Sequence, residues 1–289
     1  PRQQGRNQAF NHVGILIAAG LITLGTAHLG PEIAFWVLGA MAAAAIAAAL
    51  AMPASAFSRR RAAGWKEEED EAEPARSSYA QVFTNRRLLV LAVALALFQL
   101  GNGGMLTLLG QKLVHTADNP TAWTARYVMV AQLVMVPVAL AAGSLADWRG
   151  RRQLLLAACL ALPVRAALSA FIDDPYWLIT AEILDGVASG IIGGAVPVVV
   201  ADLTWGSGRT QTALGTVNAV QGAGGALSAW YGGLAQGWFG WSGSFLALGA
   251  AGVGALALVW WLAATTEDSR SQRRRTRREE RRRATRSAE

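Results

Sequence analysis

Three ionisable side chains inside long apolar stretches are the residues of this sequence best suited to do chemistry. Arg165 lies in the apolar stretch 153–172, and Glu182 and Asp185 lie at a similar depth in the next stretch, 176–201. Carboxylates three residues apart share one face of a helix, and an uncompensated charge in apolar surroundings is costly. We therefore expect Arg165 to pair with one of the two acids.

Two interpretations of that pair stay open. It is either a structural ion pair between two helices or part of a substrate or proton site. Two carboxylates that face one arginine leave one acid whose affinity for a proton can rise, and a proton-coupled carrier would use such an acid.

Uncharged polar side chains in the apolar stretches form a second group of candidates. Each can line the path of a solute, although a hydrogen bond between two helices explains any single one of them at least as well. The candidate substrate or proton pathway comprises Gln99, Asn102, Gln132, Arg165, Glu182, Asp185, Asn218 and Gln221.

A third group of residues has the properties expected of a gate that opens and closes the solute pathway. His12 lies beside Asn11 near the start of the first apolar stretch. Histidine is the residue type used in pH-dependent switches, so the role of His12 is either in a gate or that of a packed or water-facing histidine. The segment 143–152, GSLADWRGRR, is expected to form the turn between two apolar stretches.

The residue types in this segment explain the expectation. Gly143 would let a helix end approach a neighbour closely, and Gly150 would permit a sharp turn. Asp147 is a short carboxylate suited to a helix N-terminus, where unpaired N–H groups attract negative charge. The arginines can pair with that carboxylate or hold phosphate headgroups. The candidate gating residues are Asn11, His12, Gly143, Asp147, Gly150, Arg151 and Arg152.

Composition predicts the elements that position these residues. The chain of 289 residues is 53% hydrophobic and 16% charged, whereas soluble domains are about 45–50% apolar and about 25% charged. A helix that crosses a bilayer needs about 20 apolar residues. The sequence therefore predicts an all-α polytopic membrane protein with about eight spans, near 8–28, 32–52, 87–113, 123–143, 153–172, 176–201, 211–236 and 241–263.

The charged segment 53–86 divides the chain. It contains KEEEDEAEPARSS, which is too polar to enter lipid, and it is interpreted as a solvated linker. The expected units are residues 1–52, a helix pair, and residues 87–264, a six-helix group, followed by a basic tail at 265–289.

Basic residues predict the orientation. Of the 26 lysines and arginines, 23 fall in one set of alternating segments, which includes both termini and the linker. Cytoplasmic loops retain Lys and Arg, so both termini are expected in the cytoplasm of a multi-pass protein of the cell membrane. The tail, with RRRTRREERRR, is expected to touch anionic lipid. Charge alone identifies no nucleic acid, and we expect none as a partner.

The sequence gives no support for catalysis. It contains no nucleotide-binding loop, metal-ligand cluster or nucleophile constellation, so we expect no enzyme activity, cofactor or metal. A membrane enzyme would present catalytic acids or metal ligands at a helix end that faces the headgroups, and none is evident.

The pattern Gly-x-Leu-Ala-Asp-x-x-Gly-Arg-Arg at 143–152 resembles the signature loop of the major facilitator superfamily. That resemblance implies twelve helices in two halves of six, with a copy of the loop between helices two and three of each half. It also implies that the eight expected spans correspond to helices five to twelve, that the first four helices are absent, and that 53–86 is the central cytoplasmic loop.

The resemblance further implies a secondary transporter that works by alternating access. Proton-coupled efflux of a small organic solute is our leading interpretation; uptake of a metabolite and a truncated, non-transporting membrane partner are the alternatives. In the family, the loop aspartate of one half braces a helix of the other half. Asp147 is therefore expected to contact the turn around Gly5–Phe10, with Arg6 or Arg151 completing the cluster.

Overall fold

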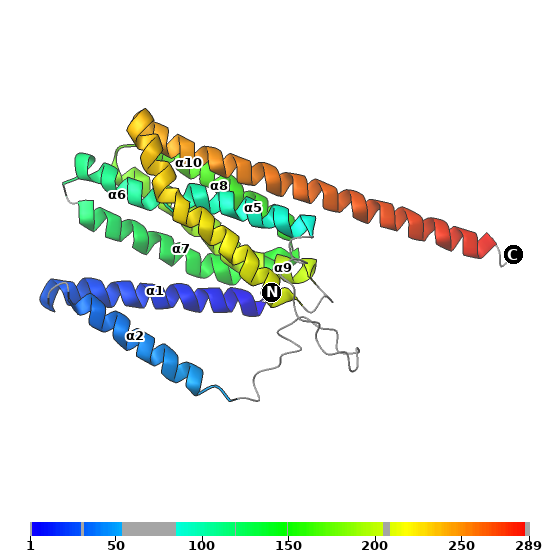
Figure 1. Cartoon of the computed structure of the whole chain (residues 1–289), viewed down its shortest axis with the longest axis horizontal. Coiled ribbons are helices and arrows are strands. Elements are labelled where there is room, and N and C mark those ends of the chain that lie inside the picture. Colours follow the sequence, from blue (N-terminus) through cyan, green and yellow to red (C-terminus); the bar gives the residue numbers. More distant parts are fainter. Residues whose placement is uncertain are drawn as a thin grey trace.

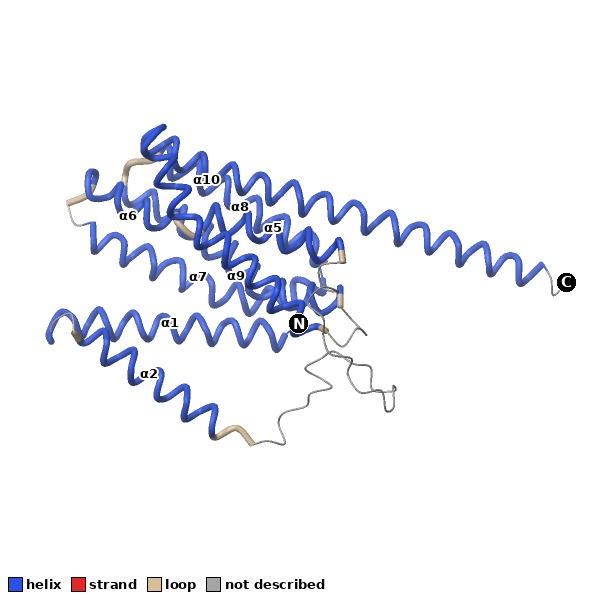
Figure 2. The backbone as a smooth tube through the Cα atoms, viewed as in Figure 1, coloured by secondary structure: helices blue, strands red, loops and turns tan. Residues whose placement is uncertain are grey.

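The computed structural model describes residues 2–29, 32–53, 85–118, 120–148, 150–204 and 209–286 (Figures 1 and 2). Every regular element within them is a helix, which confirms the all-α architecture. The helices are α1 (Arg2–Leu29), α2 (Ile33–Leu50), α5 (Arg86–Asn102), α6 (Met105–Thr116), α7 (Pro120–Trp148), α8 (Arg151–Phe171), α9 (Pro175–Leu203) and α10 (Thr210–Arg286).

Local chemistry explains where several helices begin. The Asn85 side chain caps α5 by accepting hydrogen bonds from the backbone N–H groups of Arg87 and Leu88, at 3.2 and 3.3 Å. Asp174 caps α9 by accepting from the N–H of Tyr176 at 2.7 Å, and Pro175 follows at the first helical position, where its missing N–H costs nothing. These caps satisfy backbone N–H groups that have no partner within the first turn of each helix.

Helix α10 consists of two antiparallel helices joined at Gly240. This glycine has φ 68°, a conformation that residues with a side chain rarely adopt. The Tyr231 hydroxyl donates across the bend to the carbonyl of Ala247 at 3.2 Å. The chain therefore crosses the bundle twice within α10, as the expected spans 211–236 and 241–263 require.

Helices α5 to α10 pack into one bundle through small residues. A Cβ placed on Gly186 or Gly190 of α9 would lie within 3.0 Å of Val134 or Val138 of α7. Likewise, a Cβ on Gly101 of α5 would lie 2.5 Å from the backbone carbonyl of Leu248 in α10. Such close approach is typical of helix pairs in membranes, where glycine lets two backbones come together.

The first two helices differ in how they meet this bundle. Helix α1 packs along α7 and α9, whereas α2 diverges from the bundle and packs against α1 (Figure 1). The contacts of α1 are therefore the ones that join the two expected units of the chain. Most of the linker, residues 54–84, lies outside the described residues.

Five helical stretches within the described chain are long and apolar enough to cross a membrane. The last, Thr210–Leu262, has 53 residues and holds two spans because of the bend at Gly240. Each expected span falls on a helix, but the apolar part of α2, Phe35–Leu50, is shorter and α1 is not among the five. The count of eight spans therefore stays a prediction.

The turn expected at 143–152 is wrong in extent, and the expected span 87–113 lies within one apolar stretch, Arg86–Thr116, but contains a break. The turn expected at 143–152 is much shorter, because α7 stays helical to Trp148 and α8 begins at Arg151. Helix α7 continues through Gly143, and the chain turns only at Gly150, which has φ 90°. The expected span 87–113 is interrupted after Asn102, where α5 ends and α6 starts at Met105.

Candidate functional site

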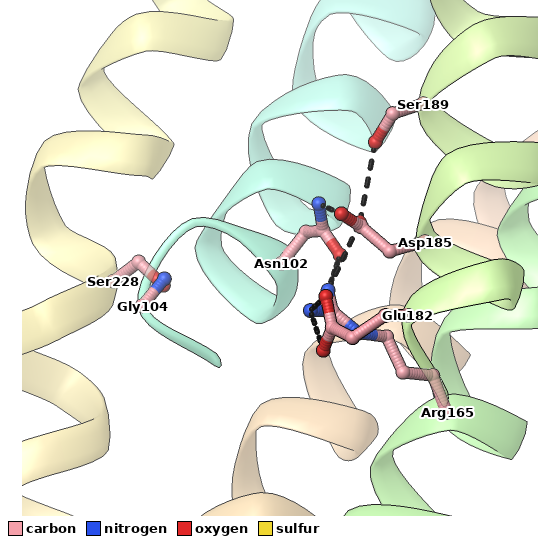
Figure 3. A network of polar contacts seen from close by, with 7 residues as sticks. All are labelled: Asn102, Gly104, Arg165, Glu182, Asp185, Ser189 and Ser228. Carbon is pink, nitrogen blue, oxygen red and sulfur yellow. Dashed lines mark hydrogen bonds and ion pairs between the residues drawn. The ribbon is translucent and has the colours of Figure 1, made fainter. Parts of the chain in front are cut away.

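A buried ionic cluster lies between α5, α8 and α9 (Figure 3). Arg165 of α8 donates from Nη2 to both oxygens of Glu182, at 2.9 and 3.2 Å, and from Nη1 to Oδ1 of Asp185 at 2.9 Å. The side chains of Arg165, Glu182 and Asp185 are 1%, 0% and 13% exposed. The expected ion pair is thus confirmed, with both carboxylates taking part instead of one.

Two uncharged side chains donate hydrogen bonds to Asp185. Asn102, the last residue of α5, accepts from Nη1 of Arg165 at 2.6 Å and donates to Oδ1 of Asp185 at 2.8 Å. The Ser189 hydroxyl, one turn further along α9, donates to the same Oδ1 at 3.3 Å. We call Asn102, Arg165, Glu182 and Asp185 the Arg165 cluster. Of the eight candidate pathway residues, the structure brings these four together.

The interruption between α5 and α6 presents Asn102 to this cluster. Across the break, the Ser228 hydroxyl of α10 donates to the carbonyl of Leu100 at 2.5 Å and accepts from the N–H of Gly104 at 2.6 Å. A continuous helix would join that carbonyl and that N–H directly. Ser228 has therefore inserted its hydroxyl into the helical hydrogen-bond ladder, a known cause of a kink.

Replacing Ser228 by alanine should destabilise the protein by about 1–3 kcal/mol, because it leaves a buried carbonyl and a buried N–H without partners. Ser169 provides a matched control, since its hydroxyl is equally buried but has no hydrogen-bond partner among the described residues. Thermal unfolding of the purified full-length protein should show a lower Tm for Ser228→Ala than for Ser169→Ala. Equal Tm values would mean that the bridge across the break does not stabilise the fold.

A second polar contact joins α1 to α7. Nδ1 of His12 lies 2.9 Å from Oε1 of Gln132, and the His12 side chain is 9% exposed. The contact joins a ring nitrogen to an amide oxygen, so Nδ1 is the donor in this hydrogen bond. Nε2 is buried and has no partner among the described residues. Gln8, one turn before His12, packs against Gly193 of α9.

The remaining pathway candidates lie apart from the Arg165 cluster. Gln99 of α5 packs against Gly225 of α10. Asn218 is exposed and Gln221 is half-buried on α10, and Asn11 is exposed on α1. None of these side chains has a hydrogen-bond partner within the part of the chain that the structure describes.

The segment 143–152 is described in part. Gly150 forms the sharp turn as expected. Arg151 forms an ion pair with Asp202 near the end of α9, and the Arg152 guanidinium stacks on Trp260 of α10. Asp202 was not a candidate, because nothing in the sequence places the end of α9 beside the start of α8. The surroundings of Gly143 and the side chain of Asp147 lie outside the described residues, so the expected contact with Gly5–Phe10 stays a prediction.

Lys112, which the sequence did not indicate as a functional residue, connects α6 to the end of α8. Lys112 is buried, and its Nζ donates to the carbonyls of Ser169 and Ile172 at 3.0 and 2.8 Å and pairs with Asp173 at 2.8 Å. A cation at a helix C-terminus is favourable because the last carbonyls carry partial negative charge. The described residues hold no group of three His, Cys, Asp or Glu side chains that could bind a metal ion.

Comparison with known sequences identifies the family. The family profile described as Major Facilitator Superfamily matches residues 1–228. The chain belongs to the major facilitator superfamily. This major facilitator chain is also 38% identical, over 261 residues, to uncharacterised transporters of the same type from two strains of Mycobacterium tuberculosis.

The match to these relatives covers 88% of the chain and 62% of their length. Membership of the superfamily makes this a multi-pass membrane protein of a transporter family, not an enzyme family. The resemblance of 143–152 to the signature loop therefore identified the family correctly.

Proposed function

We propose that the protein is a secondary transporter that exports a small organic solute by alternating access, in exchange for protons. The charge balance of the Arg165 cluster carries this proposal. One guanidinium faces two carboxylates, so the ionised cluster has one surplus negative charge in an apolar bundle. Such a charge raises the free energy of the folded protein, and the binding of one proton neutralises it.

The geometry favours Asp185 as the acid that takes up the proton. Both oxygens of the fully buried Glu182 accept from Arg165. Asp185 instead uses only Oδ1, which accepts from Asn102, Arg165 and Ser189. Its Oδ2 has no hydrogen bond among the described residues, and the side chain is partly exposed. A proton can therefore bind Oδ2 without displacing any contact of the cluster.

The surplus charge also explains why we propose exchange. A proton and a cationic solute would neutralise the same carboxylate, so they compete for the cluster. A ligand that excludes another from one site is coupled to it negatively, and a carrier in which proton and solute exclude each other moves them in opposite directions. An inward proton gradient would then drive the solute out of the cell.

Alternating access needs two units that move against each other. The contacts of α1 with α7 and α9, with the hydrogen bond between His12 and Gln132, join residues 1–52 to residues 87–264. These two ranges remain our proposed units, with 53–86 as the loop between them. The His12 contact is the described side-chain hydrogen bond that would change if the units rock.

The transport test uses the purified full-length protein in liposomes with a trapped pH-sensitive dye. With an acidic interior, a transported organic cation added outside should release protons and raise the internal pH. Tetraphenylphosphonium and ethidium are suitable first probes, with the anion benzoate for comparison. If no probe of either charge changes internal pH beyond protein-free liposomes, and radiolabelled uptake is independent of the gradient, proton exchange is wrong.

We further propose that both termini and the linker face the cytoplasm, since 23 of the 26 basic residues fall in the set of alternating segments that includes them, and that the tail at 265–289 contacts anionic lipid. A Ser77→Cys variant should resist a membrane-impermeant maleimide added to intact cells and react after permeabilisation. The native Cys159 is buried and should not react in either case. Labelling of the Ser77→Cys variant in intact cells would contradict this orientation.

A further inference from the structure

The three hydrogen bonds to Oδ1 of Asp185 come from three different helices (Figure 3). Ser189 lies one turn after Asp185 on α9 and moves with it. Arg165 of α8 also donates to both oxygens of Glu182, which belongs to α9 as well. Asn102 of α5 has no second hydrogen bond to α9 within the described chain. A shift of α5 against α9 would therefore remove the Asn102 bond before the other two.

The helix break beside Asn102 permits such a shift. Helix α5 ends at Asn102, and α6 begins at Met105. The backbone of the break lies directly on α10, because the N–H of Gly104 donates to the Ser228 hydroxyl at 2.6 Å and a Cβ on Gly104 would lie 2.9 Å from the carbonyl carbon of Ser228. The position of Asn102 thus depends on how α10 packs against the break. A movement of α10 or α6 would carry the amide away from Asp185.

The charged neighbours of Asp185 are Arg165 and Glu182. No other ionisable side chain of the described residues contacts Asp185. The ionisable groups on the other helices packed against α9 include His12 bound to Gln132, Tyr127 bound to Pro175, Tyr231 bound to Ala247, the exposed Arg126, and Arg86 and Arg87 at the far end of α5. Asn102 is uncharged, so its withdrawal changes a hydrogen bond and leaves the charges around Asp185 as they are.

A hydrogen bond to the ionised form of an acid favours that form. We propose that Asn102 is a positioning residue that makes the proton affinity of Asp185 alternate as the break between α5 and α6 moves. With the amide in place, Asp185 releases its proton to water. With the amide withdrawn, a proton from the aqueous phase forms an O–H bond at Oδ2, and the carboxylate becomes a neutral carboxyl group. This inference rests on the proposed proton exchange and names the residue that regulates it.

Infrared titration of the purified full-length protein tests the proposal without any solute. The wild type should show a carboxyl C=O band that grows as the pH falls and that is missing from Asp185→Asn, which assigns the band to Asp185. In Asn102→Ala the band should persist to higher pH, with a proton affinity roughly 10- to 100-fold above that of the wild type, the effect of one hydrogen bond to a charged group. Gln111→Ala is the matched control, because Gln111 is an exposed amide of α6 beyond the break, and it should titrate like the wild type.

A second variant tests the role of the break. Ser228→Ala keeps Asn102 and Asp185 but removes the hydroxyl that holds the backbone of the break. Asp185 should bind a proton more tightly in this variant, by a smaller factor than in Asn102→Ala. The double variant should match Asn102→Ala, because Ser228 acts through Asn102. If Asn102→Ala does not fold, Ser228→Ala provides the test by itself.

The outcomes separate this inference from the proposed exchange. A wild-type band of Asp185 whose pH dependence is unchanged in Asn102→Ala or, where that variant does not fold, in Ser228→Ala overturns the role of Asn102 and leaves proton exchange standing. The absence of any band that depends on Asp185 overturns both. An equal gain of proton affinity in Gln111→Ala would show that the effect is not specific to Asn102, and it too would contradict the proposal.

Discussion

Replacing Arg165 by methionine should destabilise the protein by about 3–5 kcal/mol, the cost of removing one partner from a buried ion pair. The substitution keeps most of the apolar volume of the side chain but leaves Glu182 and Asp185 facing each other without a cation. Glu182 is fully buried, so water cannot solvate its charge. Because the whole free energy of unfolding of a domain is about 5–15 kcal/mol, much of the variant should fail to fold.

A variant that removes all three charges distinguishes the effect of the unpaired charge on stability from the effect of the lost side-chain packing. Arg165→Met combined with Glu182→Gln and Asp185→Asn removes all three charges and should recover most of the lost stability, since apolar or neutral replacements of a whole buried pair are often nearly neutral. Arg126→Met is the control, because Arg126 is exposed and stacks on Trp123 at 4.6 Å outside the cluster.

Yield of monodisperse protein and Tm report the outcome. The single Arg165 variant should have the lowest values of both, the triple variant should approach the wild type, and the Arg126 variant should match it. A triple variant as unstable as the single one would show that the shape of the arginine side chain, and not the charge balance, stabilises the bundle. A wild-type Tm for Arg165→Met would show that the ion pair is dispensable.

The sequence was sufficient to predict the buried ion pair. Charged residues are so rare within the apolar stretches that Arg165, Glu182 and Asp185 had few other partners, and their matching depth placed them at one level of the membrane. The same reasoning could not place Asn102. Its contact depends on the end of α5 at Gly103 and Gly104, and a pair of glycines in a membrane helix equally permits close packing without a break.

The other contacts that the sequence did not predict join segments far apart in the chain. Ser228 lies 128 residues after the carbonyl that it bridges, and Gln132 lies 120 residues after His12. Serine and glutamine carry no signal of their partner, because a membrane helix accepts such residues at many positions. Only the packing of α10 on α5 and of α1 on α7 brings these pairs together. Likewise, the ion pair between Arg151 and Asp202 forms because the start of α8 lies beside the end of α9. No spacing of residues in the sequence predicts that contact.

Replacing Asp185 by asparagine should abolish proton exchange while leaving the fold intact. The amide oxygen can replace Oδ1 and accept from Asn102 and Arg165, whereas the NH₂ group that replaces Oδ2 cannot take up a proton. The surplus charge of the cluster disappears, and Arg165 stays paired with Glu182. Proton movement coupled to solute should fall about 100-fold or more, within the range of effects seen for groups that transfer protons.

The pH dependence of solute binding gives a second readout. In the wild type a proton competes with a cationic solute for Asp185, so the Kd of tetraphenylphosphonium should rise as the pH falls. In Asp185→Asn that dependence should vanish. Asp118→Asn is the matched control, because Asp118 is exposed and its loss should change neither proton exchange nor pH dependence. If Asp185→Asn keeps both properties and a wild-type Tm, Asp185 does not carry the proton and Glu182 becomes the remaining acid of the cluster.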